Sequence, residues 1–229
     1  MKTIFNFGDV HKDLTLIANT ILREYDTSYV PITNNKIFYN SELQIVSPSY
    51  GPSMVLDSLV MLKESDRIKQ KDNLIFLGSM GSFSQNIRLG DLVIPTRLYC
   101  ECLKEYQGKE VSPDKKLLEA VKEQLRKSKT KYREYIHGSV FAVFDPTTNH
   151  EKYTNSMYGD KVLGVDCSES FIGLKFSSDN GVQGLVLLYC SDDPITKITN
   201  VPKEDFDKRA FEKDLKLHQI AYETLKSVI

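Results

Sequence analysis

Short apolar runs alternate with longer amphipathic stretches along most of the chain, as they do in proteins whose strands alternate with helices. Several of the runs end in a turn of small polar residues, which is typical of buried strands. The predicted strands are Thr3–Phe7, Ile37–Tyr39, Leu43–Val46, Leu74–Leu77, Leu92–Ile94, Glu134–Val143, Val162–Val165 and Val186–Cys190.

Between these strands, apolar residues recur at helical spacing and predict helices. Capping residues mark some of the starts, as at Ser112-Pro113-Asp114. The predicted helices are Asp13–Glu24, a segment beginning near Ser53, Ser112–Lys127, Ser168–Phe176 and a last helix from Pro202. This alternation predicts one α/β domain over residues 1–229, a three-layer αβα sandwich with a central mixed, mostly parallel sheet.

Composition narrows the class of function. The 229 residues are 41% hydrophobic and 27% charged, which is ordinary for a globular protein. The net charge of −1 lacks the basic excess of a nucleic-acid binder. The first residues turn polar too early for a signal peptide, and no run approaches transmembrane length. We therefore expect a cytoplasmic protein that binds neither nucleic acid nor membrane.

The four cysteines give no sign of a metal site. Cys100-Glu101-Cys102 is too closely spaced for a zinc knuckle, and no second pair exists. Cys167 and Cys190 lie in apolar surroundings and are expected to be thiols. No metal and no cofactor are predicted.

Candidate chemistry gathers where predicted strands end. Four of them lead into polar turns: Gly8-Asp9, Gly78-Ser79, Asp166-Cys167-Ser168 and Ser191-Asp192-Asp193. In a parallel sheet the carboxyl ends of the strands meet at one edge, where ligands bind. Glycines there let the backbone approach a ligand, and hydroxyl and amide groups can donate hydrogen bonds to it. The turns predict one composite pocket, and glycine-rich connections without a ligand are the alternative.

In this order the segments resemble the nucleoside phosphorylase family, which includes purine nucleoside phosphorylases, uridine phosphorylases and methylthioadenosine nucleosidases. The most specific part is Leu77-Gly78-Ser79-Met80-Gly81 followed by Leu89-Gly90-Asp91-Leu92-Val93-Ile94, which is similar to the family's Gly-Ser-x-Gly and Gly-Asp-hydrophobic block. Phe7-Gly8-Asp9 resembles the phosphate turn, Leu163–Ser168 the ribose segment, and Tyr189–Asp192 the late Ser-Asp pair. The resemblance spans nearly the whole chain and implies a nucleoside phosphorylase-like fold.

The resemblance also implies roles for single residues. Asp192 would be catalytic, because it would protonate or hydrogen-bond the base as the glycosidic bond breaks. Phosphate, as a co-substrate, would be held by Gly8, Lys12, Gly78 and Ser79. The nucleoside would lie against Phe144, Asp166, Cys167, Ser168 and Ser191, with core packing the alternative for Phe144. The family further implies a homo-oligomer, a dimer or a trimer of dimers.

Three positions depart from the family pattern. The arginine before the Gly-Ser turn falls on Phe76, the arginine of the first turn falls on Lys12, and the second carboxylate of the ribose segment falls on Ser168. Glu169 is one residue further, and one helical step rotates a side chain by about 100°. The main hypothesis is phosphorolysis of a purine nucleoside or uridine. A phosphate-independent nucleosidase and a non-catalytic nucleoside binder, paired with an active paralogue, are the alternatives.

Overall fold

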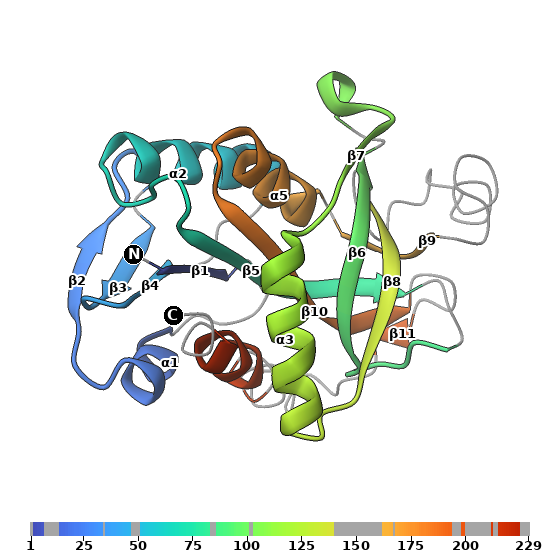
Figure 1. Ribbon diagram of the computed structural model, residues 1–229. Coiled ribbons are helices and arrows are strands. Elements are labelled where there is room, and N and C mark those ends of the chain that lie inside the picture. The colour runs from blue at the N-terminus through green and yellow to red at the C-terminus, as the bar shows by residue number, and fades with distance from the viewer. Residues whose placement is uncertain are drawn as a thin grey trace.

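The structure, a computed structural model, describes residues 2–6, 14–33, 35–46, 51–82, 86–100, 103–139, 162–166, 168–193, 198–199, 212 and 215–224. The strands are β1 (Lys2–Asn6), β2 (Asp26–Tyr29), β3 (Lys36–Tyr39), β4 (Leu43–Val46), β5 (Asn73–Ser82), β6 (Leu92–Cys100), β7 (Lys109–Val111), β8 (Tyr132–Ser139), β9 (Val162–Asp166), β10 (Gln183–Asp193) and β11 (Ile198–Thr199). The helices are α1 (Leu14–Ile21), α2 (Pro52–Glu64), the short 3-10 helix η1 (Lys104–Tyr106), α3 (Lys115–Lys127) and α5 (Glu169–Asp179), and residues 215–224 are also helical (Figure 1).

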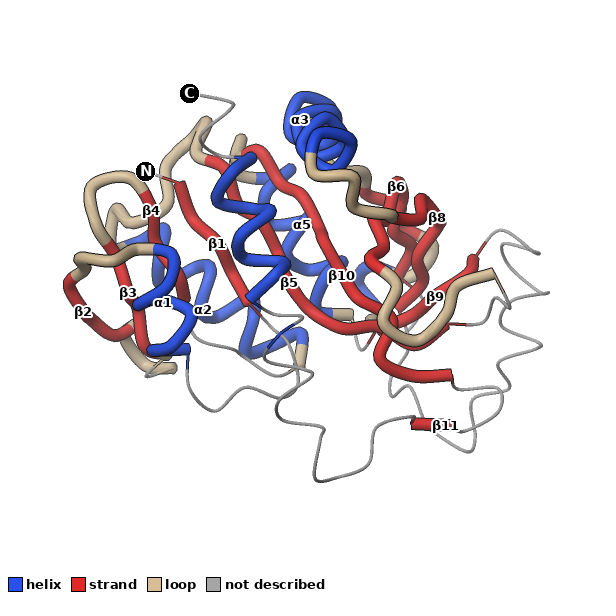
Figure 2. The backbone as a smooth tube through the Cα atoms, turned by 90° about the horizontal axis from the view of Figure 1, so that it is seen from below, coloured by secondary structure: helices blue, strands red, loops and turns tan. Residues whose placement is uncertain are grey.

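The centre of the sheet is parallel. β4, β1, β5 and β10 lie side by side in this order and run in the same direction. β3 and β2 extend the sheet beyond β4 as antiparallel strands, because short hairpin loops join them. Figure 2 shows these strands in succession across the molecule.

The other end of the sheet closes on itself. β10 pairs antiparallel with β6, β6 pairs parallel with β8, and β8 pairs parallel with β9. β9 then returns to β5 as an antiparallel partner, so that β5, β10, β6, β8 and β9 form a ring. Five of the described pairings are parallel and six antiparallel, so the sheet is mixed as expected. Parallel pairing dominates its centre, whereas hairpins and the ring closure supply the antiparallel pairs.

Two hydrophobic cores confirm the three layers. Alternate residues of β5 point to opposite faces, with Leu74 and Phe76 in one core and Ile75 and Leu77 in the other. The first core contains the buried faces of α2 and α5. The second contains those of α1, α3 and residues 215–224, so the sheet lies between two layers of helices (Figure 1).

Helix α3 illustrates how the sequence sets an element. Asp114 is its N-cap, and the carboxylate accepts the Leu117 N–H at 3.0 Å. Leu117, Val121 and Leu125 are buried at helical spacing. The observed range falls within the predicted Ser112–Lys127.

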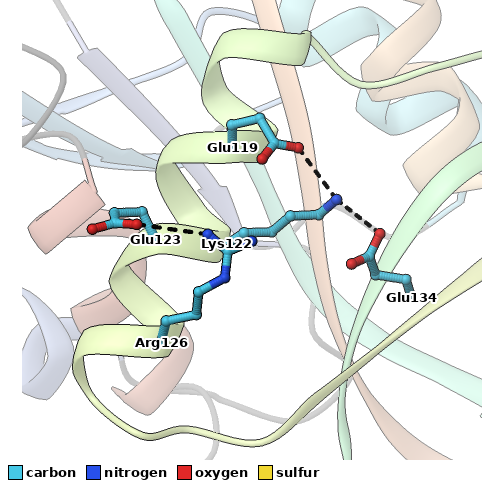
Figure 3. Close-up of polar contacts among 5 residues, drawn as sticks. All are labelled: Glu119, Lys122, Glu123, Arg126 and Glu134. Atoms are coloured by element: carbon cyan, nitrogen blue, oxygen red, sulfur yellow. Dashed lines mark hydrogen bonds and ion pairs between the residues drawn. The ribbon is translucent and has the colours of Figure 1, made fainter.

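Beside this buried face of α3, Lys122 joins the helix to β8. Its ammonium lies 3.3 Å from Glu119 Oε1 and 2.8 Å from Glu134 Oε2 (Figure 3). The lysine side chain is only 12% exposed, whereas Glu134 is 41% exposed. The hydrogen bond to Glu134, more than the other contacts, raises the pKa of Lys122 above its ordinary 10.5. The contact therefore joins α3 to β8 through a mostly buried lysine and a partly exposed glutamate.

Candidate functional site

The predicted Gly78–Gly81 turn is wrong, because β5 runs straight through it to Ser82. Ser79 is paired with Tyr189 of β10, and Gly81 with Asp192. Backbone pairing along β10 holds this glycine-rich segment extended, although its composition is that of a turn. For the same reason the predicted Ser191-Asp192-Asp193 turn is the end of β10.

Ser79 and Asp192 therefore lie on neighbouring strands of the same sheet. The register places Asp192 beside Gly81, two residues beyond Ser79 on β5. A bulge between Cys190 and Asp192 turns Ser191 toward β5, where its hydroxyl donates to the Met80 carbonyl at 3.2 Å. The predicted convergence of the Gly-Ser and Ser-Asp segments is found in the strand register.

The ribose segment reaches the same part of β5 from the other side. On that side β5 pairs with β1 as far as Leu77, and with β9 from Gly81 onward. β9 runs antiparallel to β5, with Val165 opposite Gly81 and Gly164 opposite Ser82. The ends of β1 and β9 therefore flank Gly78–Met80 on this side of β5, and α/β sheets bind ligands at the carboxyl ends of their parallel strands.

Ser168 makes the sharp turn from β9 into α5. Its side chain is buried and its backbone is left-handed, with φ 79° and ψ 0°. Such a conformation is uncommon for a residue other than glycine, asparagine or aspartate, and local strain of this kind concentrates at functional sites. Ser168 supplies no carboxylate for a sugar, as its identity already indicated.

Glu169, the next residue, points toward α2. Its Oε1 accepts the Gly51 N–H at 3.0 Å, and Gly51 is the residue that caps the N-terminus of α2. The contact joins segments 118 positions apart in the sequence, and sequence reasoning missed it. The Gly51-Pro52 pair in the sequence is a signal for the start of a helix. Nothing in the sequence indicates that Glu169 would accept a hydrogen bond from that helix start.

Phe76, where the resemblance would place the family's arginine, is buried, with 3% of its surface exposed. Its ring lies in the core shared with α2 and α5. A methyl group added at Gly173 of α5 would come within 3.3 Å of the ring, so the helix packs closely on it. This position offers apolar packing and no charge for an anion.

Several predicted site residues cannot be compared with side-chain geometry. Gly8, Lys12, Phe144 and Cys167 lie outside the described residues. Asp166 and Asp192 are placed by the register of their strands alone. Their roles stay predictions.

Two searches of the described part of the chain bear on other classes of site. Among residues that are described, no group of three or more His, Cys, Asp or Glu side chains is arranged to hold a metal ion. No helix within the same ranges has the length and apolar character needed to cross a bilayer. Cys100 and Cys190 are buried thiols.

Solved structures of nucleoside-cleaving enzymes share this fold. A 5'-methylthioadenosine/S-adenosylhomocysteine nucleosidase from S. pneumoniae aligns with a TM-score of 0.76 and 18% identity, covering 100% of both chains. Purine nucleoside phosphorylase from Toxoplasma gondii aligns with a TM-score of 0.76 and 15% identity, over 98% of this chain and 89% of that one. A futalosine hydrolase mutant from Helicobacter pylori gives 0.70 and 15%, over 100% and 98%.

No protein-family model matches the sequence, and no curated protein matches it. The structural likeness nevertheless extends over almost the entire chain. The protein has the fold of the nucleoside phosphorylases and nucleosidases, and at these identities it is a divergent example of that fold. The resemblance inferred from the motifs is thus confirmed at the level of the fold.

Proposed function

We propose that this protein hydrolyses the N-glycosidic bond of a purine nucleoside without using phosphate. Phe76 carries the proposal: a buried aromatic ring stands where a phosphorylase of this family would place an arginine for the dianion. A charge-assisted hydrogen bond to phosphate contributes roughly 1.5–3 kcal/mol, and an apolar ring contributes none of it. The fold is also that of nucleosidases from several bacteria.

In this proposal the carboxyl edge of β5 and β10 binds the nucleoside. The bond between the anomeric carbon and the base nitrogen breaks, and negative charge develops on the base. Asp192 donates a proton or a hydrogen bond to the leaving base, which lowers the barrier to its departure. Water adds to the anomeric carbon and loses a proton, so the products are the free base and the free sugar.

The structural comparisons suggest which substrates to assay first and which second reaction to consider. Neighbours of the same fold are described as acting on 5'-methylthioadenosine, S-adenosylhomocysteine or futalosine, so 5'-substituted purine nucleosides are the first to assay. Phosphorolysis is the second candidate, because Gly78 and Ser79 are retained at the sheet edge and the purine nucleoside phosphorylase has a TM-score equal to that of the first nucleosidase.

A nucleoside panel assayed with and without phosphate tests the proposal. The panel contains methylthioadenosine, S-adenosylhomocysteine, adenosine, inosine and uridine, and the released base and sugar are identified by chromatography. We expect base and free sugar at equal rates in both buffers, and loss of at least about a hundredfold in Asp192→Asn. Sugar 1-phosphate as the product would show phosphorolysis instead. Ligand binding by calorimetry without turnover of any nucleoside would favour a binding protein.

A further inference from the structure

Helices α2 and α5 are joined at both ends by a hydrogen bond that involves a side chain, and we call each of these hydrogen bonds a tie. They lie side by side on one face of the sheet and run in the same direction (Figure 1). At their N-termini the Gly51 N–H donates to Glu169 Oε1 at 3.0 Å. At their C-termini the Lys63 ammonium donates to Asn180 Oδ1 at 2.6 Å. One tie borders the candidate site, and the other is at the far end of the same helix pair.

The carboxylate of Glu169 lies between the N-termini of two helices, where a negative charge is favourable. Helices that run side by side in the same direction bring their positive N-terminal ends together, and a carboxylate between them is stabilised by both. Gly51 has φ 79° and ψ 151°, a backbone conformation that is strained for any side chain but glycine. The glycine therefore permits the turn that presents its N–H to the carboxylate.

The tie also joins two elements that border the site. α5 begins directly after the ribose segment, whose last strand residues lie alongside β5 at Gly81. α2 follows β4, which is parallel to β1 and β5 and ends at the same edge of the sheet. A shift of α2 away from α5 would widen this edge.

We propose that Glu169 is a positioning residue for the nucleoside site. By accepting the Gly51 N–H it holds the start of α2 against the start of α5, and so fixes the edge at which the nucleoside binds. This role requires a hydrogen-bond acceptor on a side chain as long as that of glutamate. It does not require the negative charge to contact the substrate. The inference rests on the proposed function only in that the ligand being positioned is a nucleoside.

Three substitutions of Glu169 separate the effect of side-chain length from the effect of charge. Glu169→Gln keeps an acceptor oxygen at the same reach, Glu169→Asp keeps the charge but is one methylene shorter, and Glu169→Ala removes both. Lys63→Ala is the matched control, because it breaks the tie at the other end of the same helix pair. Steady-state kinetics on the best nucleoside and hydrogen exchange of the Gly51 amide are measured for each variant.

We expect the Asp and Ala variants to raise KM about tenfold with kcat changed less than about threefold, and to speed Gly51 exchange about tenfold. The Gln variant should retain a KM within about threefold of wild type and a protected Gly51 amide. Lys63→Ala should leave both readouts unchanged.

Two results would overturn the inference. One is a Gln variant as impaired as Ala while its Gly51 amide stays protected, which would mean that the charge itself acts on the substrate. The other is an Ala variant with wild-type KM. Gly51 exchange does not depend on turnover, so a wild type that cleaves no nucleoside would refute the proposed function alone. In that case, hydrogen exchange of the Gly51 amide and the Kd for adenosine, measured by calorimetry, would test the role of Glu169. If Glu169→Ala does not fold, the Gln and Asp pair decides the question.

Discussion

Among single residues, Phe76 is the most informative position, because both its apolar identity and its burial argue against a phosphate-binding role. The resemblance placed an arginine there, and the structure shows a ring packed under Gly173. Ser168 is a second such position, where a small side chain fits a buried left-handed turn. Phe76 withholds a positive charge that a dianion would need, whereas Ser168 withholds a carboxylate that would accept hydrogen bonds from the sugar hydroxyls.

Restoring the arginine should damage the fold rather than create a phosphate site. Phe76→Arg buries an unpaired guanidinium in the core of α2 and α5 and should lower the free energy of unfolding by about 3–5 kcal/mol. Phe76→Leu is the control and should lower it by about 1–2 kcal/mol. Urea denaturation measures both. A stable Phe76→Arg protein whose turnover has become phosphate-dependent would contradict this reading of the site.

At the level of secondary structure, the sequence predicted the central strands and the described α-helices. It did not predict β2, β7 or β11, nor where β5 and β10 end, and the predicted helix start at Pro202 lies outside the described residues. Leu74–Leu77 is correct as the core of β5, and the strand continues to Ser82 because β10 pairs with it along its length. Glycine and serine in Gly78-Ser79-Met80-Gly81 have turn propensity, and tertiary pairing overrides it. The ring closure by β9 joins residues more than 80 positions apart, and no local pattern reports such a contact.

The candidate site was predictable in its parts and not in its geometry. The Gly-Ser and Ser-Asp motifs gave Ser79 and Asp192 as candidates, whose roles stay predictions, and the strand register places both on neighbouring strands. The sequence could state that Glu169 is displaced from the family's carboxylate position by one residue. It could not state that the side chain reaches Gly51, because that contact depends on how α2 packs against α5.

The N-terminus of α3 gives a test of local structure. Asp114→Ala removes the acceptor for the Leu117 N–H and should lower the free energy of unfolding by about 1 kcal/mol. Asp114→Asn is the control, because asparagine is an equally good cap, and it should change the stability by only a few tenths of a kcal/mol. Equal losses in the two variants, measured by urea denaturation, would show that the cap itself contributes little.

The link from α3 to β8 predicts a pH dependence. The Glu134 contact raises the pKa of Lys122 in the folded protein above 10.5, so its contribution to stability is complete below that pH. The contribution is lost as the pH rises through the folded pKa and the ammonium deprotonates. We expect wild type to be more stable than Glu134→Gln at pH of about 9, with the difference shrinking above pH of about 10.5. A difference that stays constant across this range would show that the charge of Lys122 is not involved.

At the scale of the whole molecule, the surface carries apolar side chains on both layers and on the β2–β3 hairpin. Leu16 lies on α1, Tyr29 and Ile32 lie at the hairpin, and Met54 and Val60 lie on α2. Ile32 is 82% exposed, although it sits in a left-handed backbone conformation that apolar branched residues avoid. These residues lie on separate elements, and single exposed apolar side chains of this kind are ordinary on a protein surface.

We expect the protein to form a homo-oligomer in solution, a dimer or a trimer of dimers. Sedimentation equilibrium should give two or six times the chain mass of 26.2 kDa. Met54→Glu, on the outer face of α2, should weaken the association if α2 takes part in it, whereas Glu105→Lys on η1 serves as a charge-changing control. A monomer at micromolar concentration would exclude this expectation.

The central proposal is that the protein cleaves a nucleoside with water at the edge formed by β5 and β10. The most direct test is the product of wild-type turnover of 5'-methylthioadenosine in phosphate-free buffer and in phosphate buffer. We expect adenine and free methylthioribose at the same rate in both buffers, with activity lost in Asp192→Asn. Formation of the sugar 1-phosphate, or base release only when phosphate is present, would contradict it.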